Sequence, residues 1–113
     1  MSNDLLEKKC QVCEGGDVKA LETREIEKYL KLTPDWHVIE NKKIQRTFQF
    51  KGFYKTMAFV NAVAWIANKE GHHPDMEVSF NRCVVNFTTH AIDGLTDNDF
   101  ICAAKVDQLL AEI

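Results

Sequence analysis

The chain has 113 residues, of which 45% are hydrophobic and 27% are charged, the balance of a soluble globular protein. This length suits one domain and is too short for two ordinary ones. The net charge of −3 argues against direct binding to nucleic acid or to an anionic membrane surface, and no apolar run is long enough to span a membrane.

Residues 1–20 are polar and show no sustained hydrophobic period, which predicts a flexible N-terminal arm. They lack the basic-then-apolar pattern of a secretory signal, so we expect a cytoplasmic protein with reduced cysteines. Cys10 and Cys13 form a CxxC pair, but no second pair completes a structural zinc site. We interpret the pair as a feature of the arm, with zinc binding or redox chemistry as the alternative. Cys83 and Cys102 are predicted to be small core residues.

A single folded domain is expected over residues 21–113, and it begins with a short helix. Thr23 can cap this helix, and Glu25 lies in its first turn, where a negative charge favours the helix dipole. Thr33-Pro34 ends the helix, because the residue before a proline avoids helical dihedrals. Two alternating runs then predict a β-hairpin with one buried face. The runs are Trp36–Glu40 and Ile44–Phe50, with a turn at Asn41-Lys42 between them.

Residues 53–69 have the apolar spacing of a long helix, and Gly71 stands where its C-cap would be. The apolar surface of this helix is wider than packing on one sheet face requires. Its members include Met57, Phe59, Val60, Val63 and Ala64. A fully covered core helix would explain the pattern. For so small a domain we favour a helix that also packs on another subunit, in a homodimer or homotetramer.

A second hairpin and a final helix complete the pattern. The hairpin is predicted over residues 77–80 and 83–89, with a turn at Asn81-Arg82, and Thr96 caps the final helix. The order helix, hairpin, helix, hairpin, helix predicts an α+β fold. In this fold the two hairpins form a four-stranded antiparallel sheet, with three helices packed on one face.

Three of the four histidines fall where predicted elements end. His72-His73-Pro74 lies between a helix and a strand, and His90 closes the last strand. Imidazole titrates nearer neutrality than other side chains, so converging histidines can donate and accept protons at ordinary pH. Thr88 and Thr89 precede His90, and their hydroxyl and backbone groups can bond a polar ligand. We therefore favour an acid–base site over three unrelated surface histidines.

Metal binding is the competing interpretation of the histidines. Three histidines are enough for a catalytic zinc, but the side chains of His72 and His73 should diverge, which is poor spacing for one ion. A cysteine nucleophile is weaker still, because Cys83 is expected to point into the core. We predict a site with no metal and no cofactor.

The histidines belong to a longer spaced pattern. It consists of His72-His73-Pro74, Phe80, His90 and Asp99, extended by Gly71, Thr88-Thr89 and Gly94-Leu95-Thr96, and upstream by Trp36 and Phe48–Phe53. This pattern resembles the pterin-4a-carbinolamine dehydratase family over most of the chain beyond residue 20. Together with the residue pattern, the resemblance implies catalysis by His72, His73 and His90, substrate binding by Gly71, Thr88, Thr89 and Ala91, and supporting roles for Pro74, Phe80 and Asp99.

Two positions depart from the family pattern. Many relatives have an acidic residue where this chain has Asn68, and animal members have tryptophan at the position of Met76. The first difference removes a carboxylate that could tune His72, although Glu70 is near. The second removes one surface on which a flat ligand could stack.

The resemblance implies dehydration of 4a-hydroxytetrahydropterin to quinonoid dihydropterin and water, in tetrahydrobiopterin recycling for aromatic amino acid hydroxylation. A proton must reach the leaving 4a-hydroxyl and another must leave ring nitrogen N5, which imidazoles can achieve. The alternative is a non-catalytic binding module, because relatives also act as transcription cofactors or as assembly factors for a carbon-fixing enzyme. Retention of all three histidines favours the enzyme.

Overall fold

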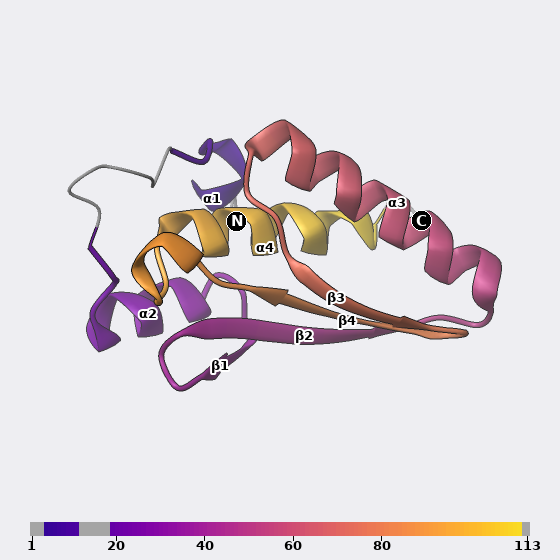
Figure 1. Cartoon of the computed structure of the whole chain (residues 1–113), viewed down its shortest axis with the longest axis horizontal. Coiled ribbons are helices and arrows are strands. Elements are labelled where there is room, and N and C mark those ends of the chain that lie inside the picture. The colour runs from indigo at the N-terminus through magenta and orange to yellow at the C-terminus, as the bar shows by residue number, and fades with distance from the viewer. Residues whose placement is uncertain (1–3, 12–18, 112–113) are drawn as a thin grey trace.

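Two long helices, α3 and α4, lie across one face of an antiparallel sheet (Figure 1). The computed structural model describes residues 4–11 and 19–111. The helices of this part are α1 (Asp4–Glu7), α2 (Thr23–Leu30), α3 (Phe53–Glu70) and α4 (Asp97–Leu109), with a 3₁₀ helix η1 (His90–Ile92). The strands are β1 (His37–Ile39), β2 (Lys43–Gln49), β3 (Asp75–Ser79) and β4 (Arg82–Phe87). This order confirms the predicted α+β fold and adds the short helix α1.

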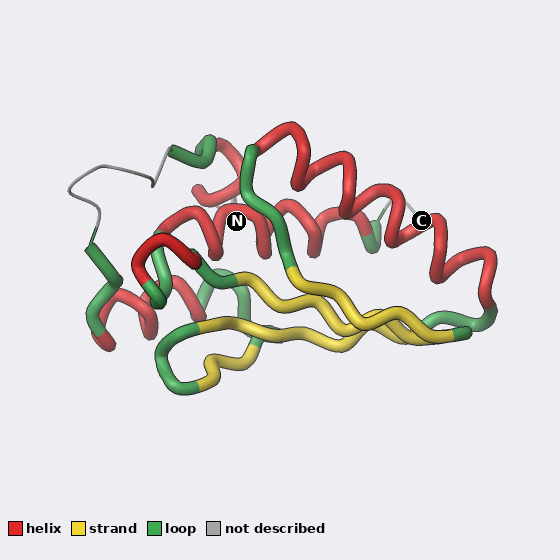
Figure 2. Tube along the Cα trace, in the orientation of Figure 1, coloured by secondary structure: helices red, strands yellow, loops and turns green. Residues whose placement is uncertain are grey.

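Both predicted hairpins form, and they join into one sheet through β2 and β4 (Figure 2). Over the described residues the strand order is β1-β2-β4-β3, with every neighbouring pair antiparallel. In the central register Ile44 lies opposite Phe87 and Phe48 lies opposite Cys83. All four are buried, because period-two alternation puts them on the same face of their strands. The predicted core position of Cys83 is thereby confirmed.

Several element boundaries differ from the sequence prediction. Strand β3 begins at Asp75, two residues earlier than expected, and its turn lies at residues 80–81. Helix α2 is capped by Glu22 rather than Thr23, in a reciprocal capping box with Glu25. Strand β4 ends at Phe87, so His90 opens η1 instead of closing a strand.

The predicted arm is docked on the domain over residues 4–11. Leu5 of α1 is fully buried and belongs to the core, and the backbone N–H of Gln11 donates to Asn98 of α4 at 2.9 Å. This docking depends on a single leucine, which no periodic pattern in residues 1–20 predicts. Residues 1–3 and 12–18, including Cys13, lie outside the described residues. No helix in the described part of the chain combines the length and apolarity needed to cross a bilayer.

The long helix α3 packs on the sheet through Phe59 and Val63, both fully buried. It ends as predicted at Gly71, which has the left-handed backbone angles φ 67° and ψ 27° and whose N–H bonds the last turn. The N–H of His72 also bonds back to the carbonyl of Ala67 at 3.2 Å. The left-handed residue therefore turns the chain sharply out of α3 and sets the direction in which His72 leaves the helix.

Replacing Gly71 by alanine is expected to lower the free energy of unfolding by about 1–2 kcal/mol, the cost of a left-handed L-residue. A Cβ at this position would meet nothing within 4 Å, so the loss has no steric part. Urea unfolding measures it, and Gly71→Asn is the matched control, since asparagine tolerates this conformation better. An alanine variant as stable as the parent chain would contradict this account of the helix end.

Candidate active site

His72 is the best-anchored histidine of the described residues. Its side chain is only 11% exposed, and its ring stacks on Phe87 with a centroid distance of 6.0 Å and an interplanar angle of 11°. Its Nε2 lies 2.6 Å from Oδ1 of Asp99, whose carboxylate is fully buried. An ionised carboxylate can only accept hydrogen bonds, so Nε2 carries the hydrogen and Nδ1 is the basic nitrogen of the neutral ring.

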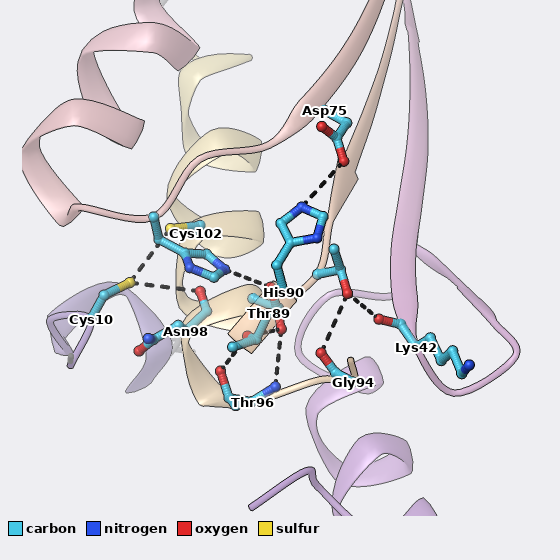
Figure 3. Close-up of polar contacts among 12 residues, drawn as sticks. Cys10, Lys42, Asp75, Thr89, His90, Gly94, Thr96, Asn98 and Cys102 are labelled. Atoms are coloured by element: carbon cyan, nitrogen blue, oxygen red, sulfur yellow. Dashed lines mark hydrogen bonds and ion pairs between the residues drawn. The ribbon is translucent and has the colours of Figure 1, made fainter. Parts of the chain in front are cut away.

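Asp99 is held by a small network at the start of α4. Its Oδ2 accepts hydrogen bonds from the Thr89 hydroxyl at 2.8 Å and from the backbone N–H of Thr96 at 3.0 Å. The Thr96 hydroxyl lies 2.8 Å from that of Thr89 (Figure 3). Because Thr89 gives its hydrogen to Asp99, Thr96 donates to Thr89. The carboxylate therefore caps α4 with one oxygen and orients His72 with the other.

His90 belongs to the same end of the β3–β4 pair. Its chain neighbour Thr89 contacts Asp99, and its own Nε2 lies 3.7 Å from the carboxylate of Asp75, three residues after His72 (Figure 3). Both members of this ion pair are more than two-thirds exposed, so it contributes little to stability. His90 therefore stands in solvent at the rim, in contrast to the enclosed His72.

His73 is exposed, whereas His72 beside it is enclosed, so the predicted divergence of the two side chains is confirmed. Pro74 is half-buried and leads into β3, while Gly71 is exposed and closes α3. These residues form one continuous strip that leaves α3 and enters the sheet. The strip brings the enclosed imidazole of His72 and the exposed imidazole of His73 to the same end of the sheet.

The other predicted site residues differ in their burial and in their distance from the histidines. The Thr88 hydroxyl donates to the carbonyl of Lys42, so Thr88 ties the end of β4 to the first hairpin. Ala91 is exposed in η1, next to His90. Thr89, which was expected to contact the ligand, is buried, and its hydroxyl donates a hydrogen bond to Asp99. Phe80 lies at the opposite end of β3 from the histidines, 64% exposed, and the structure does not bring it into this group.

Glu70 is not the carboxylate that contacts His72. Its side chain is 4% exposed and accepts hydrogen bonds from the Lys105 ammonium at 2.8 Å and from the Cys10 N–H at 3.0 Å. Burial acts to raise the pKa of Glu70, but these bonds and the lysine charge outweigh it and hold the pKa below its usual value. The carboxylate partner of His72 is Asp99, so a charge next to His72 is retained although Asn68 replaces the acidic residue of many relatives.

Sequence reasoning missed three residues of this group: Phe87, Thr96 as a partner of Thr89, and Asp75. The spacing of Thr96 and Asp99 is that of a capping box and carried a usable signal. Phe87 shares the parity of the core residues and gave no sign of contact with a histidine. Asp75 of β3 is paired with Asn86 of the neighbouring strand, near the end of β4. Its approach to His90 therefore depends on the register of these two strands.

The chain was compared with known proteins. The family model described as pterin 4 alpha carbinolamine dehydratase matches residues 19–109. A Nitrosomonas eutropha protein named as a pterin-4-alpha-carbinolamine dehydratase is 58% identical over 95% of this chain and 94% of its own length. A Legionella pneumophila protein with the same name is 56% identical over 99% of this chain and the whole of its own.

Solved structures agree with the sequence comparisons. The crystal structure of a transcriptional coactivator/pterin dehydratase from Brucella melitensis has a TM-score of 0.76 at 29% identity, over 80% of this chain and 98% of its own. A pterin dehydratase-like protein identified as a RuBisCO assembly factor shares the fold at 22% identity, with a TM-score of 0.58 over 66% of this chain and 88% of its own. The family match and the high identities over nearly the full length establish that this chain belongs to the pterin 4 alpha carbinolamine dehydratase family.

Proposed function

We propose that this chain is a hydro-lyase that converts 4a-hydroxytetrahydropterin to quinonoid dihydropterin and water. The observation that carries the proposal is the enclosed His72 ring, held through Nε2 by the fully buried carboxylate of Asp99. A surface used only to bind a partner has no need of an imidazole oriented by a buried charge. The family membership supplies the substrate class.

The reaction needs one proton given and one proton taken. We assign delivery of a proton to the leaving 4a-hydroxyl to His72 and His73, and removal of the N5 proton to His90. Asp99 fixes the ring of His72 and stabilises the charge that this ring carries when protonated. His90 stands exposed at the rim, where it can contact a flat ligand and exchange its proton with solvent. The two transfers leave the number of protons on the protein unchanged. The starting state returns when His90 releases its proton to solvent and the donor histidine takes one up.

The direct test is the decay of the pterin carbinolamine, followed by absorbance with and without the protein. We expect catalytic acceleration by the parent chain and its loss in the His72→Ala/His90→Ala double variant. A decay rate equal to the uncatalysed rate would leave the non-catalytic binding module as the better account. In the cell we place this activity in the cytosol, in tetrahydrobiopterin recycling for aromatic amino acid hydroxylation.

We further propose that catalysis needs neither metal nor cofactor. Activity is expected to survive dialysis against a chelator, because the reaction consists of proton transfers and the Nε2 of His72 is occupied by Asp99. The measurement is turnover before dialysis, after dialysis and after addition of one equivalent of zinc. Loss on chelation with recovery on zinc would overturn this proposal.

We also propose a homo-oligomer, formed through a different surface of α3 from the one that the sequence indicates. Phe59 and Val63 of the predicted double face are fully buried within this chain. The large apolar side chains that α3 exposes are instead Tyr54 at 88%, Trp65 at 64% and Phe53 at 55%. Tyr54 and Trp65 are three helical turns apart, on the same side of α3. A hollow of about 530 Å³ beside Trp65, between α1, α3 and α4, adds to this surface.

Light scattering at micromolar concentration should therefore give a multiple of the 13.0 kDa chain mass. A Trp65→Lys variant is expected to shift the mass downwards, because a charge in an apolar interface is costly. Lys55→Glu changes a charge on the same helix and is the matched control. A parent protein of monomeric mass would remove the oligomer from the proposal.

A further inference from the structure

Two cysteines that are far apart in the sequence meet at the back of the site. The Sγ of Cys10 lies 3.5 Å from the Sγ of Cys102 (Figure 3). Cys102 is fully buried in α4, whereas Cys10 is half-buried in the segment that follows α1. In the sequence Cys10 forms a CxxC pair with Cys13, which lies outside the described residues.

The backbone around Cys10 is anchored on both sides of this contact. Its own N–H donates to Glu70 at the end of α3, at 3.0 Å. The next residue, Gln11, exchanges two hydrogen bonds with the Asn98 side chain, of 2.9 and 2.7 Å. The meeting of the two thiols is therefore set by backbone docking and not by one side-chain rotation. A disulfide needs sulfur atoms about 2.05 Å apart, so closure requires an approach of about 1.5 Å.

We infer that Cys10 and Cys102 form a redox-active dithiol, which closes to a disulfide between the N-terminal segment and α4 when it meets a small-molecule disulfide. The half-buried Cys10 reacts first, gives a mixed disulfide and releases one small thiol. The Cys102 sulfur then displaces the second small thiol, which takes up the remaining proton. Two protein S–H bonds are lost and two small thiols are formed, so the two-electron exchange balances.

The surroundings of Cys102 agree with this order of events. Its hydrogen bond with Cys10, its burial and the nearby carboxylates all raise the pKa of the Cys102 thiol, so Cys102 keeps its proton in the reduced protein. Cys10 is left as the reachable sulfur. Once closed, the bond ties a segment that places Leu5 in the core to the helix that carries Asp99. Closure of such a long loop restricts the unfolded chain.

The test uses the full chain with Cys13→Ser and Cys83→Ala, in which Cys10 and Cys102 are the cysteines that remain. Incubation of the folded variant with glutathione disulfide should remove both free thiols without leaving bound glutathione. Tryptic digestion should then link the peptide 10–19 to the peptide 83–105. The melting temperature should rise on oxidation by at least about 5 °C and return on reduction.

Two comparisons make the result decisive. A further Cys10→Ser change in the same background should abolish the cross-link and the rise in melting temperature. In the parent chain, which retains all four cysteines, peptides 10–19 and 83–105 should again be joined. An internal Cys10–Cys13 disulfide in the folded parent chain would overturn the inference. So would cross-linking that occurs in urea but not in the folded variant.

Discussion

Replacing His72 by alanine is expected to lower kcat roughly a hundredfold or more, the typical loss when a general acid or base is removed. The same change leaves the buried carboxylate of Asp99 without one of its hydrogen-bond donors, so the free energy of unfolding should fall by about 1–3 kcal/mol. Turnover must therefore be expressed per folded molecule, from carbinolamine decay at a temperature well below the melting point of the variant.

The same substitution at two other histidines provides the comparison for the His72→Ala variant. His90→Ala should lower turnover by a similar factor with little change in stability, because His90 is exposed and its ion pair with Asp75 is weak. His37→Ala is the matched control, since His37 is exposed on the edge strand β1, and both quantities should stay at parent values. Full activity in the His72→Ala/His90→Ala double variant would remove the histidines from the mechanism.

Asp99→Asn is the second change with a large expected effect. An asparagine has one carbonyl oxygen and one amide group, so it cannot accept from His72, Thr89 and Thr96 as the carboxylate does. If its amide faces His72, it donates to Nε2 and the hydrogen of the neutral ring moves to Nδ1. We expect turnover to fall at least about a hundredfold, as for the loss of a carboxylate that fixes a catalytic tautomer. The weakened cap should cost about 1–2 kcal/mol.

A purely structural role for Asp99 predicts a different pair of results: a lower melting temperature with unchanged turnover per folded molecule. Nitrogen-15 NMR of the His72 ring adds a direct reading, because the hydrogen should sit on Nε2 in the parent chain and on Nδ1 in the variant. Asp97→Asn removes a charge from the same first turn of α4 and is the matched control. It should keep both the tautomer and the turnover.

The fold was largely predictable because its signals are local. Alternation of polar and apolar residues marked both hairpins, and Gly71 and Thr96 marked the helix ends that lead to the site. Edge exposure was not predictable in the same way. Val78 has the parity of a buried residue but is 43% exposed, since β3 is an edge strand of the sheet that the described residues form. Parity alone does not say how fully a face is covered.

The site was predictable in its members more than in its contacts. His72 and Asp99 both followed from the family pattern, but their 2.6 Å contact depends on how the end of α3 meets the start of α4. No local pattern encodes that approach. Thr89 shows the same limit: its position next to His90 suggested a ligand contact, and the structure gives its hydroxyl to a buried carboxylate.

The predicted site residues come from one uninterrupted stretch of the chain, between Gly71 and Asp99. This stretch contains the second hairpin, whose strands are close in sequence, whereas β2 and β4 pair across the whole length of α3. Closure of a short loop costs less entropy than closure of a long one. During folding, the stretch from His72 to His90 can therefore form together with the second hairpin, before the central strands β2 and β4 have paired. We expect the pairing of β2 with β4, which must close a longer loop, to follow and to complete the sheet.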